Sequence, residues 1–109
     1  MRRRVPLEKE SNAEIAAAVR ALGGRLIRVH TTVPVAGAPR RLSRPGTPDK
    51  VALFQDGLTL WIEQKRPGGV LSPKQIEWHA WAKRCGHAVA VVESGADVVR
   101  AVNEERARR

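Results

Sequence analysis

The feature that most constrains this chain is a strand–helix–strand unit in its second half. Residues 58–65 and 88–92 are rich in aliphatic side chains and predict two strands. Ser72-Pro73 between them is a helix start, and Gly86 ends that helix. Because residues 88–92 are wholly apolar, they predict a strand in a sheet covered on both faces. We therefore expect two parallel strands joined by a crossover helix, in an α/β fold.

The rest of the chain extends this unit to the order α-β-β-β-α-β-α, a central mixed sheet flanked by helices. Helical periodicity predicts a helix over residues 8–22, and β-branched residues predict a strand over 25–33. Residues 51–65 predict a hairpin around Gln55-Asp56-Gly57, and a final helix is expected to start at Ser94. Residues 34–48 are interpreted as a basic loop rich in proline and glycine. Residues 1–7 and 104–109 are expected to be flexible basic tails, and residues 1–109 one domain.

Composition narrows the class of protein. The 109 residues include 20 Lys and Arg against 11 Asp and Glu, a net charge of +9 that favours a nucleic-acid partner. No apolar run approaches the roughly 18 residues of a membrane helix, so no membrane partner is expected. Cys85 is the one cysteine, which excludes an internal disulfide and a cysteine-based zinc cage. The simplest location is the cytoplasm, with host cytoplasm the equivalent for a phage-encoded chain.

Three charged residues at strand ends carry the candidate chemistry. Asp49 opens the first hairpin strand, and Glu63 and Lys65 close the second, two positions apart and so on one face. Carboxylate oxygens bind Mg²⁺ or Mn²⁺, which polarises a phosphoryl oxygen and lowers the pKa of a water molecule. A lysine beside them can orient that water or stabilise the charge of the transition state. The alternative is a surface hairpin with an ordinary Glu/Lys pair.

This hypothesis depends on the register of the hairpin. A two-residue turn at Asp56-Gly57 would place Asp49 opposite Gln64, facing away from Glu63. A three-residue loop, or a bulge, would place Asp49 opposite Glu63 on the same face. The proposed chemistry requires the second register, which is therefore a structural prediction.

A fourth acid lies on the first helix. On a helical wheel Glu8 falls within about 40° of Ile15, Val19 and Leu22, at about 100° per residue. A carboxylate on a buried stripe needs a partner, and a metal ion or Lys65 would serve. The alternative is that the helix end frays and leaves Glu8 in solvent.

At this point the sequence resembles the VRR-NUC family, a branch of the PD-(D/E)xK nucleases with a restriction-endonuclease-like fold. The resemblance spans roughly residues 8–100. It is carried by the order and spacing of short motifs: Ala21-Leu22-Gly23-Gly24 with Arg28-Val29, Gly46-Thr47-Pro48-Asp49, Trp61-Ile62-Glu63-Gln64-Lys65-Arg66-Pro67-Gly68-Gly69, Gln75, and residues 86–94.

The resemblance implies a metal-dependent nuclease. Asp49 and Glu63 would hold Mg²⁺ or Mn²⁺ together with the backbone carbonyl of Gln64, and Glu8 would be the acid of the first helix. Lys65 would be the catalytic lysine. Gln75 would be the family's glutamine on the following helix. Compact stand-alone members, typical of phages and bacteria, are similar to Holliday-junction resolvases and act as homodimers.

The sequence departs from the family at two places. Gln64 stands where an apolar or small residue is usual, and its side chain is expected to point off the active face. The loop before Gly46 is longer and more basic than in compact relatives, which bears on its conformation rather than on the metal site.

Basic residues surround the carboxylates in sequence and are expected to form a phosphate-binding rim that recognises backbone and shape. The alternative is solvated loop charge. The residues assigned to DNA binding are Arg28, Arg40, Arg41, Arg44, Arg66 and Lys74.

Other aromatic residues receive structural roles. Trp78 and Trp81 are interpreted as core or dimer contacts rather than as platforms for base stacking, and a wedge tryptophan at the centre of a DNA junction is a further alternative. His30, His79 and His87 show no metal-ligand spacing, so no zinc site is expected.

The sequence thus predicts an Mg²⁺- or Mn²⁺-dependent endonuclease acting on DNA, with branched DNA as substrate, a homodimer as working form and no small-molecule cofactor. One alternative is a catalytically idle DNA-binding module of the same fold. Another is a less selective duplex nuclease of restriction or toxin type.

Overall fold

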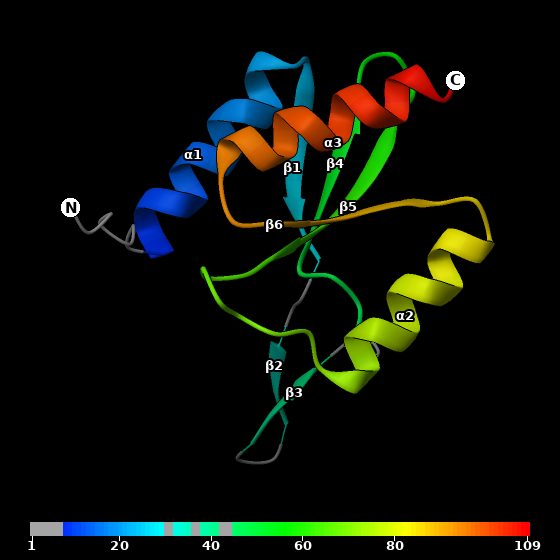
Figure 1. The fold of residues 1–109 in the computed structure, drawn as a ribbon. Coiled ribbons are helices and arrows are strands. Elements are labelled where there is room, and N and C mark those ends of the chain that lie inside the picture. Colours follow the sequence, from blue (N-terminus) through cyan, green and yellow to red (C-terminus); the bar gives the residue numbers. More distant parts are fainter. Residues whose placement is uncertain (1–7, 30–31, 36–37, 42–44) are drawn as a thin grey trace.

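A computed structural model describes residues 8–29, 32–35, 38–41 and 45–109. Within these residues the chain forms three helices and six strands (Figure 1). In chain order they are α1 (Glu8–Ala21), β1 (Gly24–Arg28), β2 (Thr32–Val35), β3 (Ala38–Arg41), β4 (Lys50–Phe54), β5 (Thr59–Gln64), α2 (Pro73–Arg84), β6 (Ala88–Val92) and α3 (Gly95–Ala107). Among the described helices, none has the length and apolarity needed to cross a membrane.

Four of the strands form one mixed sheet in the order β1-β4-β5-β6. The pairs β1–β4 and β4–β5 are antiparallel, whereas β5 and β6 are parallel and are joined through α2. The predicted mixed sheet and parallel crossover are therefore confirmed. Helices α1 and α3 lie together on one side of the sheet and α2 lies on the other, so both faces are covered (Figure 1).

The hydrophobic core lies between the sheet and the α1–α3 pair. Because successive strand residues point to opposite faces, alternate positions of β4 and β5 enter it, namely Ala52, Phe54, Leu60 and Ile62. The predicted stripe of α1 is confirmed, since Ile15 and Val19 are fully buried. The core cluster consists of Ile15, Val19, Ala52, Phe54, Leu58, Leu60, Ile62, Val92, Val98 and Val102.

The two C-terminal helices begin at serine caps, as the sequence predicts. The Ser72 hydroxyl accepts from the backbone N–H of Gln75, and the Gln75 side chain accepts in return from the backbone N–H of Ser72, which forms a capping box. The Ser94 hydroxyl accepts from Asp97 at the start of α3. These caps fix where α2 and α3 begin, and α2 is the helix that faces the candidate site.

The interpretation of residues 34–48 as a loop was wrong for part of that segment. Residues 32–35 and 38–41 pair as a separate antiparallel hairpin, β2–β3, and the predicted strand over 25–33 is divided between β1 and β2. Pro34 lies opposite Pro39, a place in a two-stranded ribbon where N–H groups point outward and proline loses no ladder bond. Proline content alone therefore misled the prediction.

The expected tail at 104–109 was also wrong for residues 104–107, which continue α3. Arg106 explains the extension. Its Nε donates to Asp56 Oδ2 (2.9 Å), and another guanidinium nitrogen donates to the backbone carbonyl of Leu22 (3.1 Å). The same guanidinium lies 5.4 Å from the Phe54 ring centroid. Residues 1–7 lie outside the described residues.

Candidate functional site

The β4–β5 hairpin adopts the register that the chemistry requires. Lys50 pairs with Ile62, and the three residues 55–57 form the loop. One step beyond the Lys50–Ile62 pair, Asp49 lies opposite Glu63 and shares its face of the sheet. The prediction that the two carboxylates face each other is confirmed.

The two oxygens of Asp49 have different surroundings. Oδ2 accepts a hydrogen bond from Lys50 Nζ at 2.7 Å, whereas the buried Oδ1 has no hydrogen-bond partner. The same Lys50 Nζ donates to Gln64 Oε1 at 2.9 Å. The Gln64 side chain is thus held by a residue of the core-facing set, off the face of Glu63, as expected. Lys50 is only 9% exposed and fixes Asp49 so that one carboxylate oxygen remains available.

Glu63 is the most perturbed acid of the site. It is 5% exposed, and its Oε1 is buried without a hydrogen-bond partner. The pKa of Glu63 rises from 4.5 to about 7, mainly because the carboxyl is buried and secondly because the Asp49 charge lies nearby, while Lys65 and Lys50 oppose the increase. Folding therefore brings together two carboxylates that repel each other, which is the arrangement that a divalent cation would relieve.

His79 is a member of this site that the sequence analysis missed. It lies on α2 with its Nε2 3.7 Å from Glu63 Oε1, and both atoms are buried without a hydrogen-bond partner. Burial lowers the pKa of His79, and the charges of Lys83 and Lys65 lower it further, so the ring is neutral at pH 7. A helical signal existed, because His79 follows Gln75 by four residues and shares its face of α2.

Lys65 is held by the helix that follows it. Its Nζ donates to Gln75 Oε1 at 2.9 Å, and that same oxygen accepts the backbone N–H of Ser72 at 2.8 Å. Gln75 thus both caps α2 and positions the lysine. The structure brings Asp49, Glu63, Lys65 and Gln75 together, and it leaves their catalytic roles as predictions.

The segment before Asp49 is held against α2 by a glycine. Gly46 is buried with φ +92°, and a Cβ there would overlap the backbone carbonyl of Lys74. Only glycine accommodates both this conformation and this approach. The contact fixes the strand end that carries Asp49 relative to the helix that carries Gln75.

The other predicted residues are placed unevenly. Glu8 begins α1, but its side chain lies outside what the structure describes, so the predicted contact with the site stays a prediction. Arg28 ends β1 opposite Lys50, and Lys74 lies in the first turn of α2. Arg66 follows the strand end and is exposed. Arg40 and Arg41 belong to β3 with side chains outside the description, and Arg44 lies outside the described residues.

The residues present fit a hard divalent cation in part. Two carboxylates on facing strand ends each have one buried oxygen without a hydrogen-bond partner, and carboxylate oxygens are the ligands that Mg²⁺ and Mn²⁺ prefer. Among the described side chains no group of three His, Cys, Asp or Glu comes close enough to form a complete cage. Mg²⁺ sites in proteins use one or two carboxylates and complete the coordination with waters.

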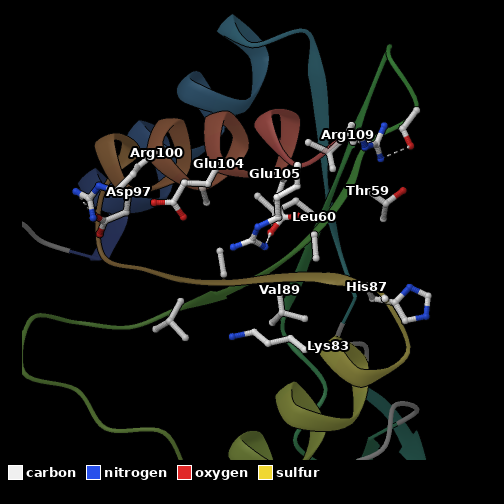
Figure 2. A pocket seen from close by; sticks show the side chains of 18 of the residues that line it. Thr59, Leu60, Lys83, His87, Val89, Asp97, Arg100, Glu104, Glu105 and Arg109 are labelled. Carbon is white, nitrogen blue, oxygen red and sulfur yellow. Dashed lines mark hydrogen bonds and ion pairs between the residues drawn. The ribbon is translucent and has the colours of Figure 1, made fainter.

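A pocket of about 1080 Å³ lies away from the Asp49–Glu63 site, along the edge strand β6 and toward the turn at Gly57 (Figure 2). Figure 2 shows α3 side chains such as Asp97 and Arg100 on one side of β6 and Lys83 on the other. Four of its charged side chains form two ion pairs, Arg100 with Asp97 at 3.3 Å and Arg108 with Glu105 at 2.6 Å. Among the described residues that line this pocket, no carboxylate oxygen is both buried and without a hydrogen-bond partner, as those of Asp49 and Glu63 are.

Three helices covering both faces of a four-stranded mixed sheet, with facing carboxylates at one sheet end, define an α/β core of the restriction-endonuclease type. A comparison with solved structures finds a chain described as a VRR_NUC domain, with a TM-score of 0.69 and 22% sequence identity. The match covers 88% of this chain and 94% of that one. No protein-family model matches the sequence, and no curated protein matches it. The likeness confirms the VRR-NUC fold.

Proposed function

We propose that this chain is a divalent-metal-dependent endonuclease that hydrolyses phosphodiester bonds in DNA. The observation that carries the proposal is the pair of facing carboxylates, Asp49 and Glu63, each with a buried oxygen that lacks a partner, beside a positioned lysine. The VRR-NUC fold and the net charge of +9 support the same conclusion independently.

The proposed roles follow from these positions. Asp49 and Glu63 would hold Mg²⁺ or Mn²⁺, with the Gln64 backbone carbonyl and Glu8 as further ligands. The bound ion would supply Lewis-acid polarisation of the phosphoryl group and a lower pKa for a water nucleophile. Lys65, held by Gln75, would orient the attacking water or stabilise negative charge on the phosphoryl oxygens.

Branched DNA and a homodimer are the finer parts of this proposal. Resolving a four-way junction needs two symmetric cuts, and a two-fold dimer supplies two sites. The basic residues Arg28, Arg66 and Lys74 would contact phosphates around the site without reading bases. A chain that stayed monomeric at micromolar concentration, with and without junction DNA, would contradict the dimeric form.

The competing function is a DNA-binding module of this fold without catalysis. The geometry of the site disfavours it, because an idle site has no need to keep two repelling carboxylates face to face, one of them buried, with a lysine fixed nearby. A less selective duplex nuclease shares the chemistry and differs only in substrate.

The test is a cleavage assay on labelled four-way junction, matched linear duplex and single strand, with Mg²⁺, Mn²⁺ or EDTA. Wild type is compared with Asp49→Asn and Lys65→Ala. Metal-dependent symmetric cuts on the junction, lost in both variants, support the full proposal. Cuts on all substrates retain the nuclease and remove the junction preference. Binding without cleavage under any metal refutes the enzymatic proposal.

A further inference from the structure

A second groove lies between α2 and the segment that leads to Asp49. Its volume is about 610 Å³, within the range of pockets that hold small organic groups. Thr47, on one wall, precedes Asp49 by two residues, and Lys74 is the neighbour of Gln75, which holds Lys65. The groove is lined by Pro45, Thr47, Lys74, Glu77, Trp78, Trp81 and Arg84.

Three tryptophans form a ladder from the sheet to this groove. Trp61 of β5 meets Trp78 edge to face, with ring centroids 5.3 Å apart, and Trp78 meets Trp81 in the same way at 5.9 Å. Trp61 and Trp78 are partly buried, whereas Trp81 is 49% exposed. Of the two roles predicted for Trp81, the exposure contradicts a core position, and a dimer contact stays a prediction. Its ring packs edge to face against Trp78 and lines the groove.

The groove has a cationic side chain at each end. Lys74 and Arg84 are ten residues apart on α2, about 15 Å along the helix axis, with Trp81 between them. Glu77 is the one carboxylate in the lining. Cations that flank an exposed aromatic ring are the elements with which proteins bind single-stranded nucleic acid, the ring stacking on a base and the cations on its phosphates.

We propose that this groove binds an unpaired stretch of the DNA substrate, with one nucleobase stacked on Trp81 and the adjoining phosphates on Lys74 and Arg84. This inference rests on the proposed function and makes it more specific. A base within intact duplex keeps its own stacking partners and cannot lie on Trp81. Substrates with single-stranded character beside the cut site therefore gain a contact that linear duplex lacks.

The experiment measures binding in EDTA, so that it does not depend on catalysis. Fluorescence anisotropy follows a labelled eight-nucleotide single strand, and a series of strands carries one abasic position moved along the sequence. Base–aromatic stacking contributes about 1–3 kcal/mol, which corresponds to about 5- to 150-fold in Kd. We expect Trp81→Ala to weaken binding by such a factor and one abasic position to weaken wild-type binding similarly.

The diagnostic result is the coupling between the ring and the base. Trp81→Ala should be insensitive to the abasic position that wild type detects, and Trp81→Phe should retain most of the sensitivity. Trp81→Leu keeps apolar bulk against Trp78 without the π-face, and serves if the alanine variant unfolds. Val99→Ala, an exposed apolar change on α3, is the matched control and should leave Kd unchanged.

A second copy of the chain is the other occupant that this surface could take. If Trp81→Ala converts a dimer to a monomer in sedimentation, and no abasic position weakens wild-type binding, the surface is a contact between copies and the proposal is overturned. The cleavage assay separates the two proposals. Coupling between Trp81 and the abasic position, without metal-dependent cleavage, supports DNA binding in the groove and refutes the nuclease proposal. Metal-dependent cleavage without this coupling supports the nuclease and refutes binding in the groove.

Discussion

Replacing Glu63 with glutamine should stabilise the metal-free protein while abolishing cleavage. Glu63 is 5% exposed, its Oε1 has no hydrogen-bond partner, and Asp49 faces it across the hairpin. Glutamine has nearly the same shape without the charge. The substitution therefore removes a buried charge and its repulsion with Asp49, and leaves the packing in place.

The magnitude follows from the pKa of Glu63. That pKa rises from 4.5 to about 7 on folding, and one pKa unit is about 1.4 kcal/mol, so ionised Glu63 destabilises the fold by about 3 kcal/mol. The sign is that of a raised folded-state pKa. The contribution of Glu63 to stability is most favourable below pH 4.5, where the folded and the unfolded state both hold its proton. It declines as the pH rises through about 7. Glu63→Gln lacks this decline.

The assay is urea unfolding in EDTA at pH 4 and at pH 8. The free energy of unfolding of Glu63→Gln should exceed that of wild type by about 3 kcal/mol at pH 8 and match it at pH 4, with about 4 °C in Tm for each kcal/mol. Glu104→Gln, an exposed carboxylate on α3, is the control and should change stability by less than about 0.5 kcal/mol. A difference that is equal at both pH values, or a destabilised Glu63→Gln at pH 8, would refute the assigned pKa.

Three further predictions test the same site. Mg²⁺ or Mn²⁺ at 100 times its Kd should raise the stability of wild type at pH 8 by about 2.7 kcal/mol, measured by thermal unfolding, and should not raise that of Asp49→Asn. Gln75→Ala should lower the cleavage rate in single-turnover kinetics at saturating substrate, because Lys65 loses its hydrogen-bond acceptor. The same change should cost about 1 kcal/mol of stability, because the α2 cap is lost. An unchanged rate would exclude the positioning role. Gly46→Ala should destabilise the fold by at least about 2 kcal/mol in urea unfolding, because φ is +92° and the Cβ meets the Lys74 carbonyl; a smaller loss would mean that this segment moves freely.

Patterns that repeat along the chain predicted most of the fold. The α1 stripe, the wholly apolar strand β6 and the serine caps are local signals that agree with the final packing. These patterns left the hairpin register open between a two-residue turn and a three-residue loop or bulge, and the structure has the three-residue loop. The structure supports this loop with Gly57, whose φ of +89° is the left-handed conformation that such loops require.

These patterns did not predict Lys50 and His79, the residues that contact the carboxylates of the site. Lys50 occupies a core-facing position, where periodicity favours an apolar residue, and its role becomes visible only when Asp49 and Gln64 lie beside it in space. His79 approaches Glu63 from a helix sixteen residues later; its spacing from Gln75 places it on the same face of α2 but does not identify Glu63 as its partner. Contacts between elements depend on how α2 lies on the sheet, which no local pattern determines.

The two faces of the sheet divide stability and chemistry between them. The face toward α1 and α3 buries an apolar cluster without a buried acid, and supplies the burial that keeps a domain of this size folded. The opposite face carries Glu63 and Asp49, and His79 of α2 approaches it; each of the three has a buried polar atom that lacks a hydrogen-bond partner. A penalty of about 3 kcal/mol at Glu63 is a large share of the 5–15 kcal/mol that domains have. An arrangement that repels itself in the absence of a ligand, and that a divalent cation would stabilise, fits a site kept for binding rather than for folding.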